Sequence, residues 1–216
     1  PMVVRVADIA EKAVGRENVY VATDDDRIKN VVEDNNYNVI MTSPEHPCCT
    51  DRVAEASEKI DADIIVNLQG DEPMLNPNEI KLAIDAKQKY PDYVINCASP
   101  LHSSEEPENR NVIKMVMGLN DNLICASRNP IPVEKSGNAP ICKKQVCIYV
   151  YNKEELRLFG KQGTTPLEDV EEVDILRFLE MEVPVKIISV SGDSHAVDVP
   201  GDIEIVENLL REKDSE

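Results

Sequence analysis

The sequence predicts an α/β protein with a mostly parallel sheet flanked by helices and a β-rich region inserted in its second half. Short apolar runs alternate with helix-like patterns through the first half of the chain. Residues 64–68 form a mainly apolar run that leads to Gly70, which is typical of a strand buried on both faces. Residues 120–122 form a polar turn between two apolar runs. Residues 1–216 suit one domain, in which residues 99–165 are the β-rich insertion.

The first half of the chain contains the alternation of helices and strands. Apolar residues spaced along one face predict a helix at residues 3–14. The acidic residues 24–26 can cap the helix that follows them, and Asn76-Pro77 is typical of a helix start. The predicted elements are helices at residues 3–14, 27–34, 51–60 and from 77 onward, and strands at residues 19–22, 39–42 and from 63 onward.

The second half of the chain is richer in strands. Residues 112–119 and 123–127 flank the sequence Asn-Asp-Asn, which predicts an antiparallel hairpin. A pattern with acidic residues at its start predicts one helix at residues 168–180. The remaining predicted elements are strands at residues 93–98, 145–151 and 185–190, and a closing helix at residues 200–210.

The composition narrows the possible partners. The formal net charge of −18 argues against a nucleic acid or an anionic membrane surface, because both recruit basic patches. A small anionic ligand remains compatible, because phosphate needs only local cations, helix N-termini or a metal. No apolar run approaches the roughly 20 residues of a membrane span. The six cysteines include no Cys-x-x-Cys pair, so we expect a reducing, cytoplasmic location.

The strand that begins near residue 63 ends in candidate ligands for a metal ion. Gly70 allows a sharp turn, and Pro73 prevents the strand from continuing. Asp71 and Glu72 are therefore expected at the carboxyl edge of the sheet, where open α/β folds bind ligands. A carboxylate held there is suited to a hard cation such as Mg²⁺. The alternative is a solvated Gly-Asp turn.

Two strings far apart in the sequence carry a resemblance to a known family. Gln-Gly-Asp-Glu-Pro at residues 69–73 is followed by Val-Asp-Val-Pro-Gly-Asp at residues 197–202. Together they resemble the cytidylyltransferases that activate 3-deoxy-manno-octulosonate (Kdo) by making a CMP-sugar from CTP. The resemblance covers nearly the whole chain and implies a Rossmann-like nucleotidyltransferase sheet, with a β-rich region for dimerisation and sugar binding. Further matching strings lie at residues 21–24, 50–52, 111–114, 127–132, 148–149, 165–168 and 174–177.

The resemblance implies a reaction in which a sugar hydroxyl attacks the α-phosphorus of CTP and pyrophosphate leaves. Both reactants are anions, and two unit charges about 4 Å apart cost about 4 kcal/mol at an effective dielectric near 20. The reaction therefore needs cations. By resemblance, Asp71 and Asp198 are the catalytic residues that hold Mg²⁺. The alternative role of Asp198 is to cap the helix that follows it. The product would serve lipopolysaccharide biosynthesis.

The resemblance also implies which residues contact the substrates. Arg128 would grip the sugar carboxylate with its planar guanidinium. Its alternative role is a surface salt bridge, and Tyr149 could instead be a core residue with a solvated hydroxyl. The implied sugar-binding residues are Gln69, Arg128, Gln145, Tyr149 and Asp174, and the implied nucleotide-binding residues are Thr50 and Arg52.

Two departures from the family pattern concern the nucleotide side. The family begins with a strand and an Arg/Lys/Gly-containing loop that cradles the triphosphate, whereas residues 1–216 begin just beyond that loop. We therefore expect efficient turnover of CTP to need such a loop. A Ser-Gly pair usually precedes Thr50, but Cys48-Cys49 stands there. If the second position required a positive φ, Cys49 would be strained.

Other departures concern the sugar side. Gln145 replaces a His of the Kdo enzymes, Cys147 replaces a Gly, and Asp174-Ile175 replaces Glu-Gln. The loss of a hydrogen-bonding amide at Ile175 would cost a polyhydroxylated acid about 1–3 kcal/mol. The substrate is therefore expected to be a 2-keto-3-deoxy sugar acid, either Kdo or a related acid.

Two other functions remain compatible with the sequence. One is a non-catalytic relative that binds nucleotide or sugar without the phosphate loop. The other is a metal-dependent glycosyltransferase, since such enzymes also end a strand with acidic residues. The resemblance to the cytidylyltransferases also implies a homodimer that forms through the β-rich middle of the chain.

Overall fold

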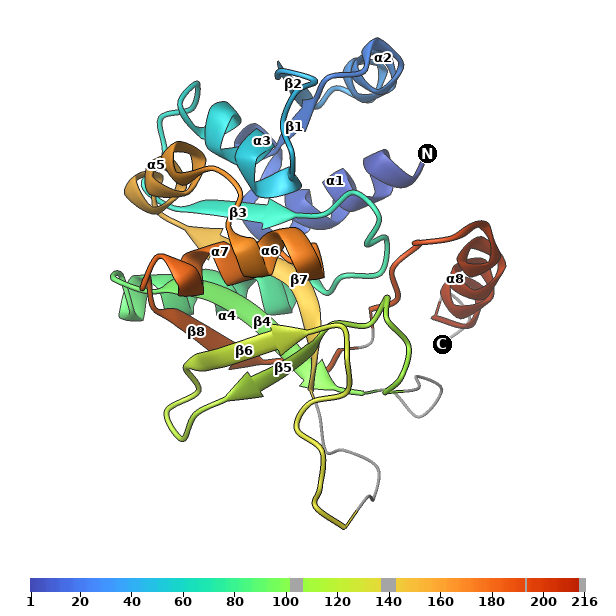
Figure 1. The fold of residues 1–216 in the computed structure, drawn as a ribbon. Helices are drawn as coiled ribbons and strands as arrows, with labels where there is room; N and C mark the ends of the chain where they lie inside the picture. Colours follow the sequence, from blue (N-terminus) through green and yellow to red (C-terminus); the bar gives the residue numbers. More distant parts are fainter. Residues whose placement is uncertain (102–106, 137–142, 193, 214–216) are drawn as a thin grey trace.

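The structure is a computed structural model that describes residues 1–101, 107–136, 143–192 and 194–213 (Figure 1). Its helices are α1 (Met2–Val14), α2 (Asp26–Asp34), α3 (Cys49–Ser57), α4 (Pro77–Lys89), α5 (Lys153–Gln162), α6 (Pro166–Glu171), α7 (Ile175–Glu180) and α8 (Pro200–Lys213), with a 3₁₀ turn at Arg16–Asn18. Its strands are β1 (Tyr20–Thr23), β2 (Asn38–Met41), β3 (Ile65–Leu68), β4 (Val94–Pro100), β5 (Lys114–Met117), β6 (Leu123–Ser127), β7 (Lys143–Tyr151) and β8 (Val185–Ser189). None of the described helices is long and apolar enough to cross a membrane.

The N-terminal part of the chain forms a small layer of its own around β1 and β2. These two strands pair in parallel, as the alternation of elements predicts. The side chain of Asp25 caps α2 by accepting a hydrogen bond from the amide of Arg27, so the predicted acidic cap is confirmed. Ala7 and Ile9 of α1 are buried, as the periodicity of that helix predicts, and Val6 beside them is buried as well.

The main sheet is mixed, and the prediction of a mostly parallel sheet is wrong. Its strands follow the order β6-β5-β7-β4-β8, and β3 also pairs with β7. Among the described neighbouring strands of this sheet, β4 and β8 are the one pair that is parallel, whereas β7 runs antiparallel to β3, β4 and β5, and β6 runs antiparallel to β5. The physical reason is that β7, from the predicted insertion, lies between β3 and β4 and runs antiparallel to both.

One edge of β7 is shared by two strands that leave a gap between them. β3 pairs with residues 148–151 of β7, whereas β5 pairs with residues 143–144. The stretch of β7 from Gln145 to Cys147 therefore lies between the carboxyl end of β3 and the start of β5. Crevices of this kind, where neighbouring strands diverge, are where α/β sheets bind ligands.

Alternating residues of β7 face two different hydrophobic clusters. Tyr149 and Tyr151 pack with Phe178 of α7, whereas Ile148 and Val150 pack in the cluster that contains α4. Figure 1 shows α6 and α7 on one side of β7 and α4 on the other. The face that carries Tyr149 also carries Gln145 and Cys147 because side chains alternate along a strand.

The structure confirms the predicted hairpin, the helix start at Asn76-Pro77 and the closing helix. It differs from the prediction at two other helices. The single helix predicted at residues 168–180 is two helices, α6 and α7, because Glu172 adopts a left-handed backbone conformation with φ of 51°. Helix α5 was not predicted. Asn152 and Glu155 form a capping box at its start, which the Asn-x-x-Glu spacing could have indicated.

A groove of about 1170 Å³ separates β1 from β3. The facing strands both contribute to its lining, together with α1, α3 and α4. At one end the groove is apolar, with Val19 and Ile64 among its residues, and at the other end it is lined by Gln69 and Asp71. The groove therefore runs between β1 and β3 and reaches the carboxyl end of β3.

Candidate active site

Asp71 and Asp198 lie together at the carboxyl end of β3, although they are far apart in sequence. The amide of Val197 donates a hydrogen bond to the carbonyl oxygen of Asp71 over 2.9 Å, which fixes the segment before Asp198 against that strand end. Burial raises the pKa of Asp71. Burial, followed by the negative charge of Asp71, raises the pKa of Asp198. Two mutually repelling carboxylates in one place are an arrangement that a cation would stabilise.

The residues present fit a hard divalent cation. Asp71 Oδ1 is buried and has no hydrogen-bond partner among the described residues. A buried carboxylate oxygen without a donor is an available ligand for Mg²⁺. Before α8, Asp202 Oδ2 accepts the amides of Asp198 and Val199, each over 2.9 Å, which holds the backbone at Asp198 in place.

Glu72 is buried beside these aspartates and is held by its own partners. The hydroxyl of Ser194 donates to Glu72 Oε2, and the thiol of Cys147 on β7 also contacts this carboxylate. Burial raises the pKa of Glu72, and Ser194 partly offsets that effect. Glu72 therefore joins the end of β3 to β7 and to the segment before α8.

Gln69 and Asp174 meet at the first turn of α3. The thiol of Cys49 donates to Asp174 Oδ2 over 3.1 Å and accepts a hydrogen bond from Gln69 Nε2 over 3.3 Å. The amide of Thr50 also donates to Asp174 Oδ2 over 3.1 Å. Burial and the charge of Asp174 raise the pKa of Cys49 to about 12, so the thiol stays neutral at physiological pH. Cys49 is the first residue of α3 and is absent from the described residues with positive φ, so the expected strain does not occur.

Gln145 and Tyr149 line the same face of β7. Tyr149 is buried and stacks on Tyr151 with a centroid separation of 6.3 Å. Burial raises the pKa of Tyr149, and the nearby charge of Asp174 contributes in the same direction. Gln145 is buried and donates from Nε2 to Asn96 Oδ1 over 2.9 Å.

Arg128 follows β6 and is anchored by backbone carbonyls. Its Nε donates to the carbonyl of Glu171, Nη1 to that of Arg110 over 2.8 Å, and Nη2 to that of Glu172 over 3.0 Å. The positive charge of Arg128 partly offsets the raised pKa of Asp198, which places the two side chains within electrostatic reach of each other. Its guanidinium thus forms no surface salt bridge among the described residues, and its donors are fixed in direction.

The predicted nucleotide-side residues, Thr50 and Arg52, both lie on α3. Arg52 Nη1 donates to Thr42 Oγ1 over 2.6 Å and pairs with Asp24 Oδ1 over 3.1 Å. Arg52 therefore links α3 to the loops that follow β1 and β2. Thr50 is buried, and its hydroxyl lies 3.5 Å from the hydroxyl of Tyr151. Arg52 and Asp71 both line the groove between β1 and β3.

A buried ionic cluster around Arg177 was not predicted. The Arg177 side chain is fully buried, and it donates from Nη1 and Nη2 to the two carboxylate oxygens of Asp51 over 2.9 and 3.0 Å. Its Nε donates to Glu168 Oε2 over 2.6 Å, and its Nη2 donates to Glu168 Oε1. These carboxylates raise the pKa of Arg177 despite its burial. The signal was visible only in part, since Glu168 and Arg177 lie in strings that matched the family (residues 165–168 and 174–177) but were given no role.

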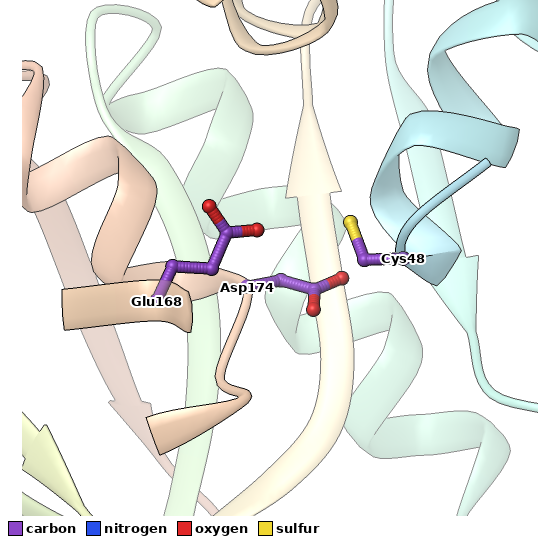
Figure 2. Close-up of side chains that lie close together, drawn as sticks. All are labelled: Cys48, Glu168 and Asp174. Atoms are coloured by element: carbon purple, nitrogen blue, oxygen red, sulfur yellow. The ribbon is translucent and has the colours of Figure 1, made fainter. Parts of the chain in front are cut away.

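Three side chains beside this cluster have the geometry of a metal site. Figure 2 shows Cys48, Glu168 and Asp174 pointing toward one another, with their donor atoms within 4.8 Å of one another. Both oxygens of Glu168 already accept from Arg177, and Arg177 Nη2 lies 3.7 Å from the Cys48 sulfur. The guanidinium thus occupies the position of a cation, and these residues form an ionic cluster of the fold.

The comparisons with known proteins assign this protein to the class of nucleotidyltransferases, and a mixed sheet with carboxylates at the end of one strand agrees with it. Residues 1–187 match the model of the cytidylyltransferase family. A solved structure titled CMP:2-keto-3-deoxy-manno-octonic acid synthetase complexed with CTP superimposes with a TM-score of 0.90. It is 28% identical and covers 99% of this chain and 88% of that one.

Curated relatives narrow the class further. The 3-deoxy-manno-octulosonate cytidylyltransferase 2 of Hydrogenovibrio crunogenus is 38% identical over 97% of this chain and 88% of its own length. The 8-amino-3,8-dideoxy-manno-octulosonate cytidylyltransferase of Shewanella woodyi is 36% identical over the same shares of the two chains. This chain therefore belongs to the family of 3-deoxy-manno-octulosonate cytidylyltransferases.

Proposed function

We propose that this protein transfers CMP from CTP to Kdo or its 8-amino derivative, releases pyrophosphate, and so serves lipopolysaccharide biosynthesis. The likeness to curated relatives acting on both acids supports the reaction and the two substrates. The observation that carries the proposal is the convergence of Asp71 and Asp198 at the carboxyl end of β3. Nucleotidyl transfer between two anions needs positive charge at that point.

Asp71 and Asp198 would hold Mg²⁺ in this reaction. A bound Mg²⁺ supplies positive charge that orients the phosphates and offsets the charge developing on them. The role of the protein chain is to hold these two carboxylates in place. The hydrogen bond from Val197 to Asp71 does this for the backbone, and Asp202 fixes the backbone at Asp198 through its amide.

The sugar acid would bind on the face of β7 that carries Gln145 and Tyr149. Arg128 would bind the sugar carboxylate, because its guanidinium is held rigidly by three carbonyls near Asp198. Gln69 and Asp174 would contact sugar hydroxyls from the side of α3. On the nucleotide side, Thr50 and Arg52 would contact CTP. The site would thus bring the sugar hydroxyl and the α-phosphorus together beside Asp71.

The direct test is pyrophosphate release from CTP in the presence of Mg²⁺ and a panel of 2-keto-3-deoxy sugar acids. We expect release with Kdo or 8-amino-Kdo and none when the acid is left out. Replacing CTP by ATP or GTP controls for nucleotide choice. Binding of CTP without any release would favour the non-catalytic alternative. Transfer from a preformed nucleotide sugar without CTP consumption would favour a glycosyltransferase.

We also propose a homodimer that forms through the β-rich region, in a reducing, cytoplasmic setting. Leu119 and Ile124 on the β5–β6 hairpin are exposed apolar side chains that a second copy could cover. The cysteines that the structure describes are all free thiols. This supports the proposal of a reducing compartment. Light scattering of the protein and of Ile124→Lys, which should weaken the association, tests the dimer.

A further inference from the structure

Gln145 carries an unused hydrogen-bond acceptor in the middle of the proposed sugar site. The residue is only 9% exposed, and its Oε1 atom has no hydrogen-bond partner among the described residues. It lies on β7 where the end of β3 and the start of β5 diverge. A buried amide oxygen without a donor is rare in a folded protein, so the atom calls for an explanation.

The orientation of this amide is set by Asn96, its neighbour on β4. Asn96 is completely buried, and its Nδ2 donates to the carbonyls of Val146 and Ile148 over 3.0 and 2.9 Å. Carbonyl oxygens only accept, so the NH₂ group of Asn96 must face them and its Oδ1 must point the other way. That Oδ1 accepts from Gln145 Nε2 over 2.9 Å.

The orientation of Asn96 decides which group of Gln145 donates and which accepts. Because Asn96 presents an acceptor, Gln145 must present its NH₂ group to it. The amide of Gln145 cannot turn over without placing two oxygens against each other. Gln145 Oε1 is therefore fixed as an acceptor, and its partner must be a hydrogen-bond donor.

We propose that Asn96 is a positioning residue that fixes Gln145 Oε1 as the acceptor for one hydroxyl of the sugar acid. This inference rests on the proposed function and adds the group that the site selects. A substrate lacking that hydroxyl leaves the buried oxygen unpaired, which disfavours the analogue by about tenfold or more.

Neighbouring side chains give the site the same directional character. Gln69 uses Nε2 on Cys49, and Asp174 uses Oδ2 on Cys49 and Thr50. Two acceptors, Gln69 Oε1 and Asp174 Oδ1, are left over on that side together with the second N–H of Gln69, whereas the donors of Arg128 lie near Asp198. An acid with a carboxylate at one end and hydroxyls at the other is complementary to this division.

The first test compares Gln145→Met with the unchanged protein. Methionine is similar in length but offers no comparable acceptor. We expect the KM for the sugar acid to rise about tenfold, with the KM for CTP unchanged. Single-deoxy analogues of the acid locate the partner, because the analogue lacking the paired hydroxyl should be insensitive to the substitution. The matched control is Gln162→Met at the exposed end of α5, which should change neither constant.

The second test is a double-mutant cycle with Asn96→Val. If Asn96 acts through Gln145, Asn96→Val raises the sugar KM in the unchanged protein but adds nothing in Gln145→Met. Asn96→Thr keeps a hydroxyl that can donate to a carbonyl and accept from Gln145, so it should retain most of the affinity. This variant also keeps the test usable if Asn96→Val does not fold.

The outcomes separate this inference from the proposed function. No pyrophosphate release by the unchanged protein with any acid contradicts the proposed function itself. Release by the unchanged protein together with an unchanged sugar KM in Gln145→Met overturns the role of Gln145. Additive effects of Asn96→Val and Gln145→Met overturn the positioning role of Asn96.

Discussion

Two regions of this molecule bury carboxylates, and they treat the charge in opposite ways. Around Arg177, Asp51 and Glu168 share one buried guanidinium in a closed set of hydrogen bonds. At the carboxyl end of β3, Asp71 and Asp198 repel each other, and Asp71 Oδ1 lacks a donor among the described residues. The first arrangement is complete in the protein alone, whereas the second leaves a buried carboxylate oxygen without a donor within the described ranges, as the proposed cation site requires.

The contrast teaches which buried carboxylates belong to the fold and which belong to the function. Paired charges raise the pKa of Arg177 and hold α3, α6 and α7 together. Unpaired burial raises the pKa values of Asp71 and Asp198 and so opposes their ionised forms. Substitutions in the two regions should therefore separate stability from activity.

The largest effect should come from removing the guanidinium of Arg177. Arg177→Met leaves the buried carboxylates of Asp51 and Glu168 without a cation, which should cost about 3–5 kcal/mol in the free energy of unfolding. Urea unfolding measures this loss. The matched control is Arg157→Met, which removes an arginine that pairs with Glu58 on the surface and should leave the midpoint nearly unchanged. Similar midpoints for the two variants would remove the distinction between the regions.

Asp71→Asn should give the opposite pattern. We expect kcat for pyrophosphate release to fall at least about 100-fold, the usual cost of one well-placed electrostatic group. The free energy of unfolding should stay the same or increase, because an unpaired buried charge is removed. Asp63→Asn, an exposed aspartate before β3, is the control and should change neither quantity. A nearly normal rate in Asp71→Asn excludes the metal-binding role.

The response to Mg²⁺ should depend on pH. A raised pKa means that the folded protein binds the proton more tightly than the unfolded chain does, so this contribution to stability exists at low pH and is lost as pH rises through the raised pKa. Mg²⁺ replaces the proton, and it should raise Tm more at about pH 8 than at about pH 5. Thermal unfolding with Mg²⁺ and with EDTA measures the difference. An equal shift in Asp71→Asn would assign the cation to another site.

The smallest effect should come from Cys48, at the margin of the Arg177 cluster. Its thiol donates to Asp51 Oδ2 over 3.1 Å. Cys48→Ala removes this hydrogen bond and the weak contact from Arg177 Nη2 to the sulfur, but it leaves the ion pairs of Arg177 intact, so it should cost about 1 kcal/mol in urea unfolding. A loss as large as that of Arg177→Met would mean that the thiol, and not the guanidinium, holds the cluster together.

Features that depend on neighbouring residues were predictable from the sequence. The cap of α2 by Asp25, the helix start at Asn76 and the β5–β6 hairpin all follow from local patterns, and the structure confirms them. The position of β7 between β3 and β4 was not predictable, because no local pattern states which distant strands pair. The break between α6 and α7 was not predictable either. A left-handed residue that ends a helix is usually a glycine, whereas here it is Glu172.

The sequence indicated which residues form the candidate site, but it did not indicate which of them contact one another. Asp71 and Asp198 were named from motifs, and the structure brings them together. The roles of the predicted substrate-binding residues stay predictions. Asn96 was missed because its effect depends on two carbonyls of β7, a strand some fifty residues away. Arg177 was missed for a similar reason, since its partner Asp51 lies on a helix far away in the sequence.

The groove between β1 and β3 has a consequence for the motions of the molecule. In the described parts of the chain, β1 pairs only with β2 and β3 only with β7, so the amides that point into the groove have no strand partner. Their hydrogens should exchange with solvent faster than those of β7, which is paired along both edges. A ligand that contacts Arg52 on α3 and Gln145 on β7 at the same time would slow exchange on both sides of the groove.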